Sequence, residues 1–289
     1  MSNIRNNLLV ITFGISCWEG RRLDKKATAE VAQSHVVSSG VGRYHKDLLP
    51  DAVEHQNILK LRNAWRVFHA ENTLAWGDNG ERVIRSSAFL DYTTGYRAYK
   101  DKFDQAVEVF CAAYPTLVAE AEFKLNTLFN PSDYPAVEDV RDKFKVRMTT
   151  YPMPNAEDFR LIEGIPEEDV ERLQAEAVAG LQSQVTMAIK DLWSRLHTVV
   201  TAMQARLDVG DDGKVLKFHD SLVGNIQDLL NRVPALNLTG DAEIVSLTEE
   251  MQELVTFTPS ELREIPEARS LVANKARDIA KRMSCFVAD

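Results

Sequence analysis

The chain has 289 residues, of which 45% are hydrophobic and 27% are charged, and its formal net charge is -9 at pH 7. This composition is typical of a globular protein of one large or two small domains and disfavours disorder. So acidic a chain repels nucleic acid and anionic lipid unless positive charge is locally concentrated, as it is in residues 1–70, where ten bases face six acids.

The first 80 residues predict one strand and two helices. Residues 8–18 are β-branched and aromatic without a helical period, which is typical of a buried strand. Residues 24–35 predict a short helix, and a second helix is expected from Pro50 onward, with its apolar side chains on one side. The glycine-rich run 76–80 then predicts a turn.

Aromatic residues dominate the first of two long helical stripes. Between Phe89 and Leu128 apolar side chains recur at steps of three or four, or about 3.5 residues per step. Pro115 lies inside this stripe and has no backbone N–H to donate. We therefore expect a kink or a break near Ala113 and Tyr114.

A second strand is predicted at about 144–153, because apolar and polar residues alternate there and prolines close the segment. A lone strand leaves its backbone groups unpaired, so we expect it to pair with the N-terminal strand. The proline-rich passage that follows is the best candidate for a domain boundary. It divides the chain into residues 1–154 and 155–289, unless the two parts form a single intertwined domain.

Aliphatic residues form the second long stripe, from Val170 to Leu207, at about 3.7 residues per step. Pro166 and three acids precede it and suit the start of a helix. The fold class that follows is mainly α, with the two long helices in an antiparallel hairpin or an elongated bundle and one small β element. A turn is expected at 210–213 and a helix at 215–233, which Pro234 ends. Two more helices are expected, one that starts at residue 241 and one at 260–286.

The sequence predicts neither a membrane helix nor a secretory signal. No apolar run approaches the ~18 to 20 residues that a membrane span needs, and bases instead of a cleavage site follow residues 8–17. The three cysteines, Cys17, Cys111 and Cys285, are odd in number and far apart, which indicates a reducing compartment. We therefore expect a cytoplasmic protein without membrane partners.

No catalytic, cofactor or metal site is predicted. The six histidines lack metal-ligand spacing, and the glycines at 40 and 42 lack the third glycine of a dinucleotide loop. Acid pairs at 157–158 and 167–169 lie beside expected helix starts, where they suit the helix dipole. G-x-S-x-G is absent as well. A non-enzymatic protein is the expectation.

One basic cluster is the best candidate surface for a partner or for nucleic acid. It comprises Trp18, Arg21, Arg22, Lys25 and Lys26, joined by Arg43, Tyr44, His45 and Lys46. The bases suit phosphates, and a solvated charged face is the plainer interpretation. Likewise, the aromatic stripe from Tyr92 to Phe103 is either a platform for stacking bases or a helix core.

Five segments of the chain resemble a bacterial and phage family that has no assigned activity. They are residues 15–26, ISCWEGRRLDKK; 42–50, GRYHKDLLP; 70–76, AENTLAW; 132–135, SDYP; and 236–240, LNLTG. The resemblance extends over nearly the whole chain. Members of that family occur in bacteriophages and integrative mobile elements, near genes for a MoxR-like AAA ATPase and a von Willebrand A-type protein.

The resemblance implies a setting in a bacterial host cell and provides no catalytic residues. It favours an interaction or assembly protein that acts with the ATPase and the adaptor, and homo-oligomers are compatible with it. The alternative is a nucleic-acid-binding accessory factor in phage DNA metabolism or recombination. The segment after the first strand is then either a docking surface or a salt-bridged turn that locks strand to helix.

Overall fold

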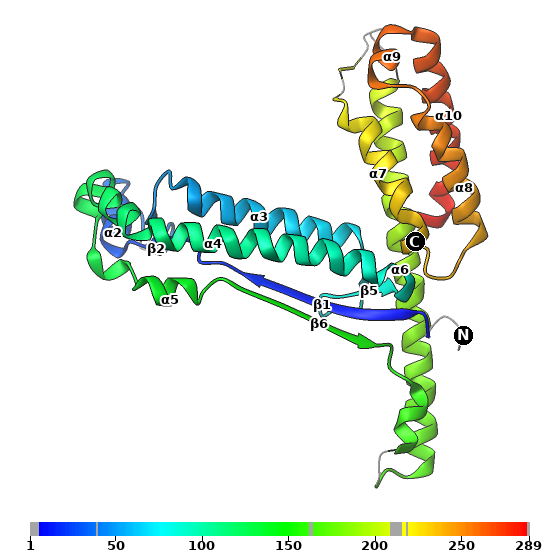
Figure 1. The fold of residues 1–289 in the computed structure, drawn as a ribbon, viewed down its shortest axis with the longest axis horizontal. Coiled ribbons are helices and arrows are strands. Elements are labelled where there is room, and N and C mark those ends of the chain that lie inside the picture. The colour runs from blue at the N-terminus through cyan, green and yellow to red at the C-terminus, as the bar shows by residue number, and fades with distance from the viewer. Residues whose placement is uncertain (1–5, 39, 162–163, 209–215, 218, 288–289) are drawn as a thin grey trace. The chain divides into compact units, whose positions relative to one another are not determined.

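The protein is mainly α-helical, as its sequence predicts, and carries two small antiparallel sheets (Figure 1). A computed structural model describes residues 6–38, 40–161, 164–208, 216–217 and 219–287, so that the turn expected at 210–213 lies outside the described residues. Among the helices described, none is both long and apolar enough to cross a membrane.

Two compact units make up the chain, and neither is a continuous stretch of sequence. Unit 1 comprises Met1–Thr12, His69–Tyr92 and Thr149–Asp289, and unit 2 comprises Phe13–Phe68 and Thr93–Met148. Four elements contribute residues to both units. They are β1 (Leu8–Ser16), α3 (Val53–Glu71), α4 (Phe89–Leu125) and β6 (Lys145–Pro152).

The larger sheet has the strand order β4-β5-β1-β6, in which β1 lies beside β6 and also beside β5. The strands β4 (Leu74–Trp76) and β5 (Glu81–Arg85) form a hairpin with Trp76 opposite Glu81. Gly77 and Gly80 have φ angles of 61° and 76°, which a glycine adopts without strain, so the turn predicted at 76–80 is the hairpin turn. These two short strands are elements that the sequence pattern did not predict.

Unit 1 is built around α6 (Glu167–Leu207), the second predicted long helix. Its buried positions, among them Leu192, Leu196 and Met203, lie on the predicted aliphatic stripe. Its main packing partner is α10 (Pro266–Val287), and α7 (Ser221–Leu236) and α8 (Ala242–Gln252) complete a bundle (Figure 1). The packing of α6 is therefore that of an elongated bundle, and α10 takes the place in which we expected the first long helix.

A buried arginine fastens the C-terminal end of α6 within unit 1. Arg269 of α10 donates from Nε to the carbonyl oxygen of Leu207 at 2.9 Å and from Nη2 to that of Arg206 at 2.8 Å. The last carbonyls of a helix have no partner inside the helix, and a cation there also complements the helix dipole. Arg269 thus satisfies two carbonyls at the end of α6 with one side chain.

In unit 2 the aromatic stripe of α4 faces a core. Trp65 of α3 is fully buried, and its ring lies 5.1 Å from that of Tyr96 and 5.9 Å from that of Phe103, between centroids. These rings pack against protein, which favours the core interpretation of the stripe over a base-stacking platform. The remaining elements of the unit are α2 (Lys25–Ser34), α5 (Val137–Arg141), β2 (Arg21–Leu23) and β3 (His45–Asp47).

The break that was one of the two alternatives expected near Ala113 and Tyr114 does not occur, because α4 is continuous through Pro115, and the kink stays a prediction. The proline removes one hydrogen bond of the helix, a loss of about 3 kcal/mol in a helix interior. Phe110 and Tyr114 before it and Ala121 after it are buried in the same core, and this burial offsets the loss. In the same way α7 extends two residues past Pro234, where we expected it to end.

In the part of the chain that the structure describes, five short 3-10 segments complete the elements, together with the short helix α9 (Pro259–Glu264). The 3-10 segments are η1 (Ser86–Ala88), η2 (Asn126–Leu128), η3 (Pro131–Asp133), η4 (Ala156–Leu161) and η5 (Glu253–Val255). Of these, η2 and η3 matter for the site described next, because they follow the end of α4 in unit 2.

Candidate functional site

The two halves of the predicted basic cluster meet in one small ribbon of unit 2. Strands β2 and β3 are antiparallel, with Arg21 opposite Asp47, Arg22 opposite Lys46 and Leu23 opposite His45. Because side chains alternate across a strand, Arg22 and Lys46 share one face of the ribbon, and the residues on either side of them share the other. The ribbon carries residues from two of the segments on which the family resemblance rests.

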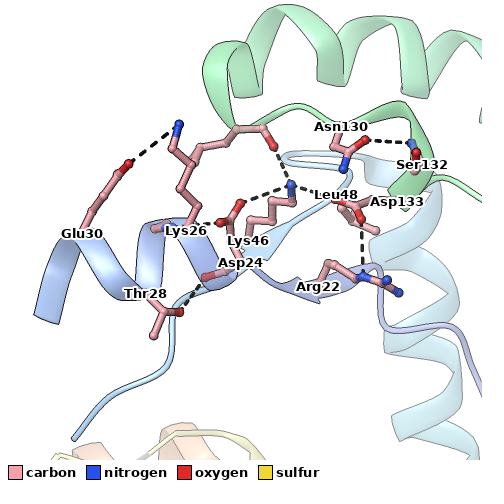
Figure 2. A network of polar contacts seen from close by, with 12 residues as sticks. Arg22, Asp24, Lys26, Thr28, Glu30, Lys46, Leu48, Asn130, Ser132 and Asp133 are labelled. Carbon is pink, nitrogen blue, oxygen red and sulfur yellow. Dashed lines mark hydrogen bonds and ion pairs between the residues drawn. The ribbon is translucent and has the colours of Figure 1, made fainter. Parts of the chain in front are cut away.

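Lys46 lies at the centre of a buried ionic network (Figure 2), and only 5% of its side chain is exposed. Its Nζ is 2.8 Å from Asp133 Oδ2 and 3.4 Å from Asp24 Oδ2, and it donates to the carbonyl oxygen of Leu128 at 2.5 Å. An ammonium group has three donors, and all three find acceptors here. The network joins β3 to the start of α2 and to the segment after α4.

Lys46 and Asp24 each shift the pKa of the other toward the charged form. Burial by itself lowers the pKa of Lys46, but the hydrogen bonds and negative charges of Asp133 and then Asp24 outweigh it and hold this pKa above its ordinary value. The pKa of Asp24 is lowered, first by the backbone N–H of Ala27 and further by Lys46. Both groups therefore stay charged at neutral pH.

Asp24 also organises the helix that follows it. Its Oδ1 accepts from the backbone N–H of Ala27 at 2.9 Å, as an N-cap residue does, and its carbonyl oxygen accepts from Thr28 Oγ1 at 2.6 Å. The backbone N–H of Asp24 donates to the carbonyl of Tyr44 at 2.9 Å, and that of Tyr44 donates to Thr28 Oγ1 at 3.0 Å. The return strand is thus tied to the first turn of α2.

Asp133 brings a third segment of the resemblance to the same place. Its Oδ1 lies 3.4 Å from Arg22 Nε, while its other oxygen binds Lys46. The neighbouring Tyr134 donates its hydroxyl to the carbonyl of Leu48 at 2.8 Å. Segments 15–26, 42–50 and 132–135 therefore converge on one network, although 109 positions separate Asp24 from Asp133.

Trp18 belongs to the aromatic core of unit 2 more than to the surface. Its ring centroid is 5.8 Å from that of His55 and 5.9 Å from that of Tyr114, and the residue is half-buried. The carbonyl oxygen of Trp18 lies 2.7 Å from His55 Nε2. With Arg66 Nη2 donating to the carbonyl of Ile15 at 3.0 Å, these contacts fasten the predicted segment to α3.

The remaining bases of the predicted cluster point outward. Arg21, Lys25, Lys26, Arg43 and His45 are all exposed. Lys26 lies 4.0 Å from Glu30 on its own helix, a separation at which exposed pairs contribute little. The predicted cluster thus divides into an internal part, around Lys46 and Trp18, and an external basic part.

The acids Asp24 and Asp133 were not predicted as members of the site. For Asp24 a signal was present, since an aspartate just before a predicted helix is a typical N-cap. For Asp133 no local signal exists, because its role depends on a contact formed between distant parts of the chain. No cluster of three metal-ligating side chains occurs among the residues that the structure describes.

A second polar network surrounds the segment 70–76 in unit 1. Arg82 and Arg195 both donate to the carbonyl oxygen of Ala70, at 3.0 and 2.9 Å, near the end of α3. Beside them His69 Nδ1 lies 2.8 Å from the hydroxyl of Tyr92, and both side chains are buried. Burial, and then the charge of Arg82, lower the pKa of His69 to about 4, so its imidazole is neutral at pH 7.

Unit 1 also contains a mostly apolar cleft of about 680 Å³. Trp76 and Met153 line it, and Gln174 Nε2 is buried there with no hydrogen-bond partner among the described residues. Glu81, one of two carboxylates in the lining of the cleft, accepts from the hydroxyl of Tyr151, whose pKa burial and Glu81 raise to about 12. That hydroxyl keeps its proton at neutral pH and donates it in this hydrogen bond.

Comparisons of the chain with protein-family models, with curated proteins and with solved structures found no match.

Proposed function

We propose that the protein is a non-enzymatic interaction or assembly protein of a phage or mobile element. It acts in the cytoplasm of the bacterial host as an accessory to a MoxR-like AAA ATPase and a von Willebrand A-type adaptor. Partner binding resides in the segment from β2 to β3, outside the Lys46 network. The proposed host and partners rest on the resemblance of five sequence segments. The proposed position of the binding surface rests on the geometry of the ribbon.

The observation that carries the proposal is that a buried ion network fixes a small, strongly charged platform. Lys46 holds the ribbon from inside, while Arg21, Lys25 and Arg43 are exposed, and no carboxylate of the described residues lies within ion-pair distance of these three. Charges that are held on rigid elements and lack internal partners are available to another molecule. The network around Lys46 stabilises the fold, and binding of a partner is the role we propose for the exposed bases.

Mixing the purified full chain with a MoxR-like AAA ATPase and a von Willebrand A-type adaptor tests this function. We expect the chain to co-elute with one of them in size-exclusion chromatography and to change the rate of ATP hydrolysis. An unrelated AAA ATPase serves as the control for nonspecific association. If the chain neither co-elutes nor alters hydrolysis, the proposal is refuted.

The exposed bases also favour a second function, a nucleic-acid-binding accessory factor. Phosphate contacts by Lys and Arg weaken as salt rises, because bound counterions are released. This function predicts a gel shift at low salt that disappears when Arg21, Arg22, Lys25 and Lys26 are neutralised. The absence of a shift with single- and double-stranded DNA at low salt excludes it.

A further inference from the structure

The chain from the end of β2 to the start of β3 exposes several large apolar side chains. Six large hydrophobic side chains lie at least a third exposed within 22 positions, and we call them the 23–44 surface. Their exposed fractions are 37% for Leu23, 48% for Val31, 92% for Val36, 42% for Val37, 68% for Val41 and 40% for Tyr44. Contiguous exposed apolar side chains mark interaction sites in monomeric proteins.

Hydrogen bonds fix the two ends of α2, on which or beside which these residues lie. The backbone N–H of Val37 donates to the carbonyl of Ala32 at 3.0 Å, which folds the chain back on the end of α2. At the other end of α2, Tyr44 is bound to Thr28 and Asp24 through the contacts described above. Leu23 lies opposite His45 in the ribbon. The surface therefore lies on α2 and on the described residues that flank it.

Val36 is held in a conformation that is unfavourable for its own side chain. Its φ angle is 52°, in the left-handed region, where a β-branched residue is rare and glycine or asparagine is preferred. The backbone explains this φ angle, because the N–H groups of Val36 and Val37 donate to the carbonyls of Gln33 and Ala32 at 3.2 and 3.0 Å and so end α2 with a left-handed residue. The turn does not explain the valine, whose side chain is 92% exposed. An exposed apolar side chain at this position suits contact with another molecule.

Positive charge surrounds the apolar residues. Arg21, Lys25, Lys26 and Arg43 are exposed around the segment, against the exposed acids Glu30 and Asp47. A complementary surface must therefore be apolar at its centre and negatively charged at its rim. DNA offers phosphates to the bases but gains nothing from the valines. The acid excess of residues 71–289 opposes approach to an anionic bilayer.

We propose that the 23–44 surface docks into an apolar pocket rimmed by carboxylates on a partner protein. Val36 is the apolar knob, and Lys25 and Arg43 pair with the rim. This inference rests on the proposed function, because the partner it describes is the adaptor or the ATPase. It adds to that function the chemistry by which the partner is recognised.

Two substitutions separate docking from folding, because each of them suits the fold. Val36→Asn places a residue that tolerates a positive φ at this position. Lys25→Glu puts a carboxylate in the first turn of α2, where the helix dipole favours it. Val53→Asn is the matched control, since Val53 is 60% exposed in the same unit but lies outside the 23–44 surface.

Affinity for the purified adaptor and ATPase, measured by calorimetry, tests the proposal. We expect Val36→Asn and Lys25→Glu each to weaken binding about tenfold, as the loss of one buried valine or one interfacial charge does. Val53→Asn should bind as the wild type does, and the affinity of the wild type should fall with added salt more than that of Lys25→Glu.

The possible failures are distinguishable. If the wild type binds and both variants bind equally well, the 23–44 surface is not the docking site, and the proposed function stands. If the wild type binds neither protein, the function and the docking proposal fall together. If the wild type instead binds vesicles of phosphatidylglycerol and phosphatidylcholine, or duplex DNA, and both variants lose that binding, the surface serves another ligand and the assignment to a protein is overturned.

Discussion

Replacement of Lys46 by methionine removes the charge at the centre of the network and keeps an unbranched side chain of similar length. If the network holds the ribbon to α2 and to the segment after α4, the free energy of unfolding must fall. The ammonium has three acceptors and is 5% exposed, so its loss affects several buried groups at once.

The size of the loss follows from what remains around the two carboxylates. Removing one partner of a buried ion pair costs about 3 to 5 kcal/mol, because the other charge stays buried without compensation. Asp133 keeps Arg22 at 3.4 Å, and Asp24 keeps the N–H of Ala27 at 2.9 Å. We therefore expect Lys46→Met to cost about 3 kcal/mol, at the lower end of that range.

Urea unfolding of the full chain at pH 7, followed by circular dichroism and tryptophan fluorescence, measures this loss. Arg22→Met is the matched control, because it removes a cation from the same carboxylate, Asp133, but one whose side chain is 63% exposed. We expect this control to cost less than about 1 kcal/mol. If Lys46→Met costs no more than Arg22→Met, the network does not hold the ribbon and the reasoning is refuted.

The same variant has a defined dependence on pH. The pKa of Asp24 is lowered in the folded chain, so its stabilising effect is complete above the ordinary value of 3.8 and is lost as the pH falls through the lowered one. The difference between wild type and Lys46→Met must therefore shrink in acid. A difference that is constant from neutral pH to pH values below the lowered pKa would contradict an ionic origin.

Three further predictions concern single positions. The pKa of His69 is lowered from 6.5 to about 4, so the chain takes up a proton on unfolding at pH values between these two. The free energy of unfolding of the wild type should therefore fall by about 2 kcal/mol from pH 7.5 to pH 5, and that of His69→Gln should not. Urea titration at both pH values measures this. Gly95→Ala should destabilise by about 1 kcal/mol, since its Cβ would lie 2.4 Å from Phe68 Cζ, whereas Gly180→Ala, with open space, should stabilise by about as much. Thermal unfolding of both variants decides whether the signs differ. Arg269→Met should lower the free energy of unfolding by about 2 kcal/mol, because it leaves buried carbonyls at the end of α6 without donors, and an unchanged urea midpoint would exclude that role.

The long helices could be predicted because each buries one face. The stripe of α6 places Leu192, Leu196 and Met203 at helical spacing, and all three are buried. Short strands such as β4, with three residues, contain too little sequence for any period, so the hairpin was missed. The path of α4 through Pro115 was missed too, because burial on both sides of the proline is a tertiary property.

The site shows the same division between local and distant information. The two groups of bases could be found because each is compact in the sequence, but their pairing as a ribbon is a tertiary contact. Nothing local distinguishes Lys46 from Lys25, although one is buried and the other exposed. The difference arises from Asp133, 87 positions further along the chain, and no spacing rule reaches that far.

The division into interleaved units has a consequence for the order of synthesis. Unit 2 is complete once Met148 has left the ribosome, whereas unit 1 opens with the first residues and is closed only by the C-terminal helices. Its early core residues, such as Leu8, Val10 and Trp76, must wait for α6 and α10 before their burial in that core is complete. Nascent chains leave the ribosome at about 5 to 20 residues per second, so the delay between Trp76 and the end of α10 lasts about 10 to 40 seconds. During that time the half-finished unit 1 is the part of the protein most exposed to chaperones and to aggregation.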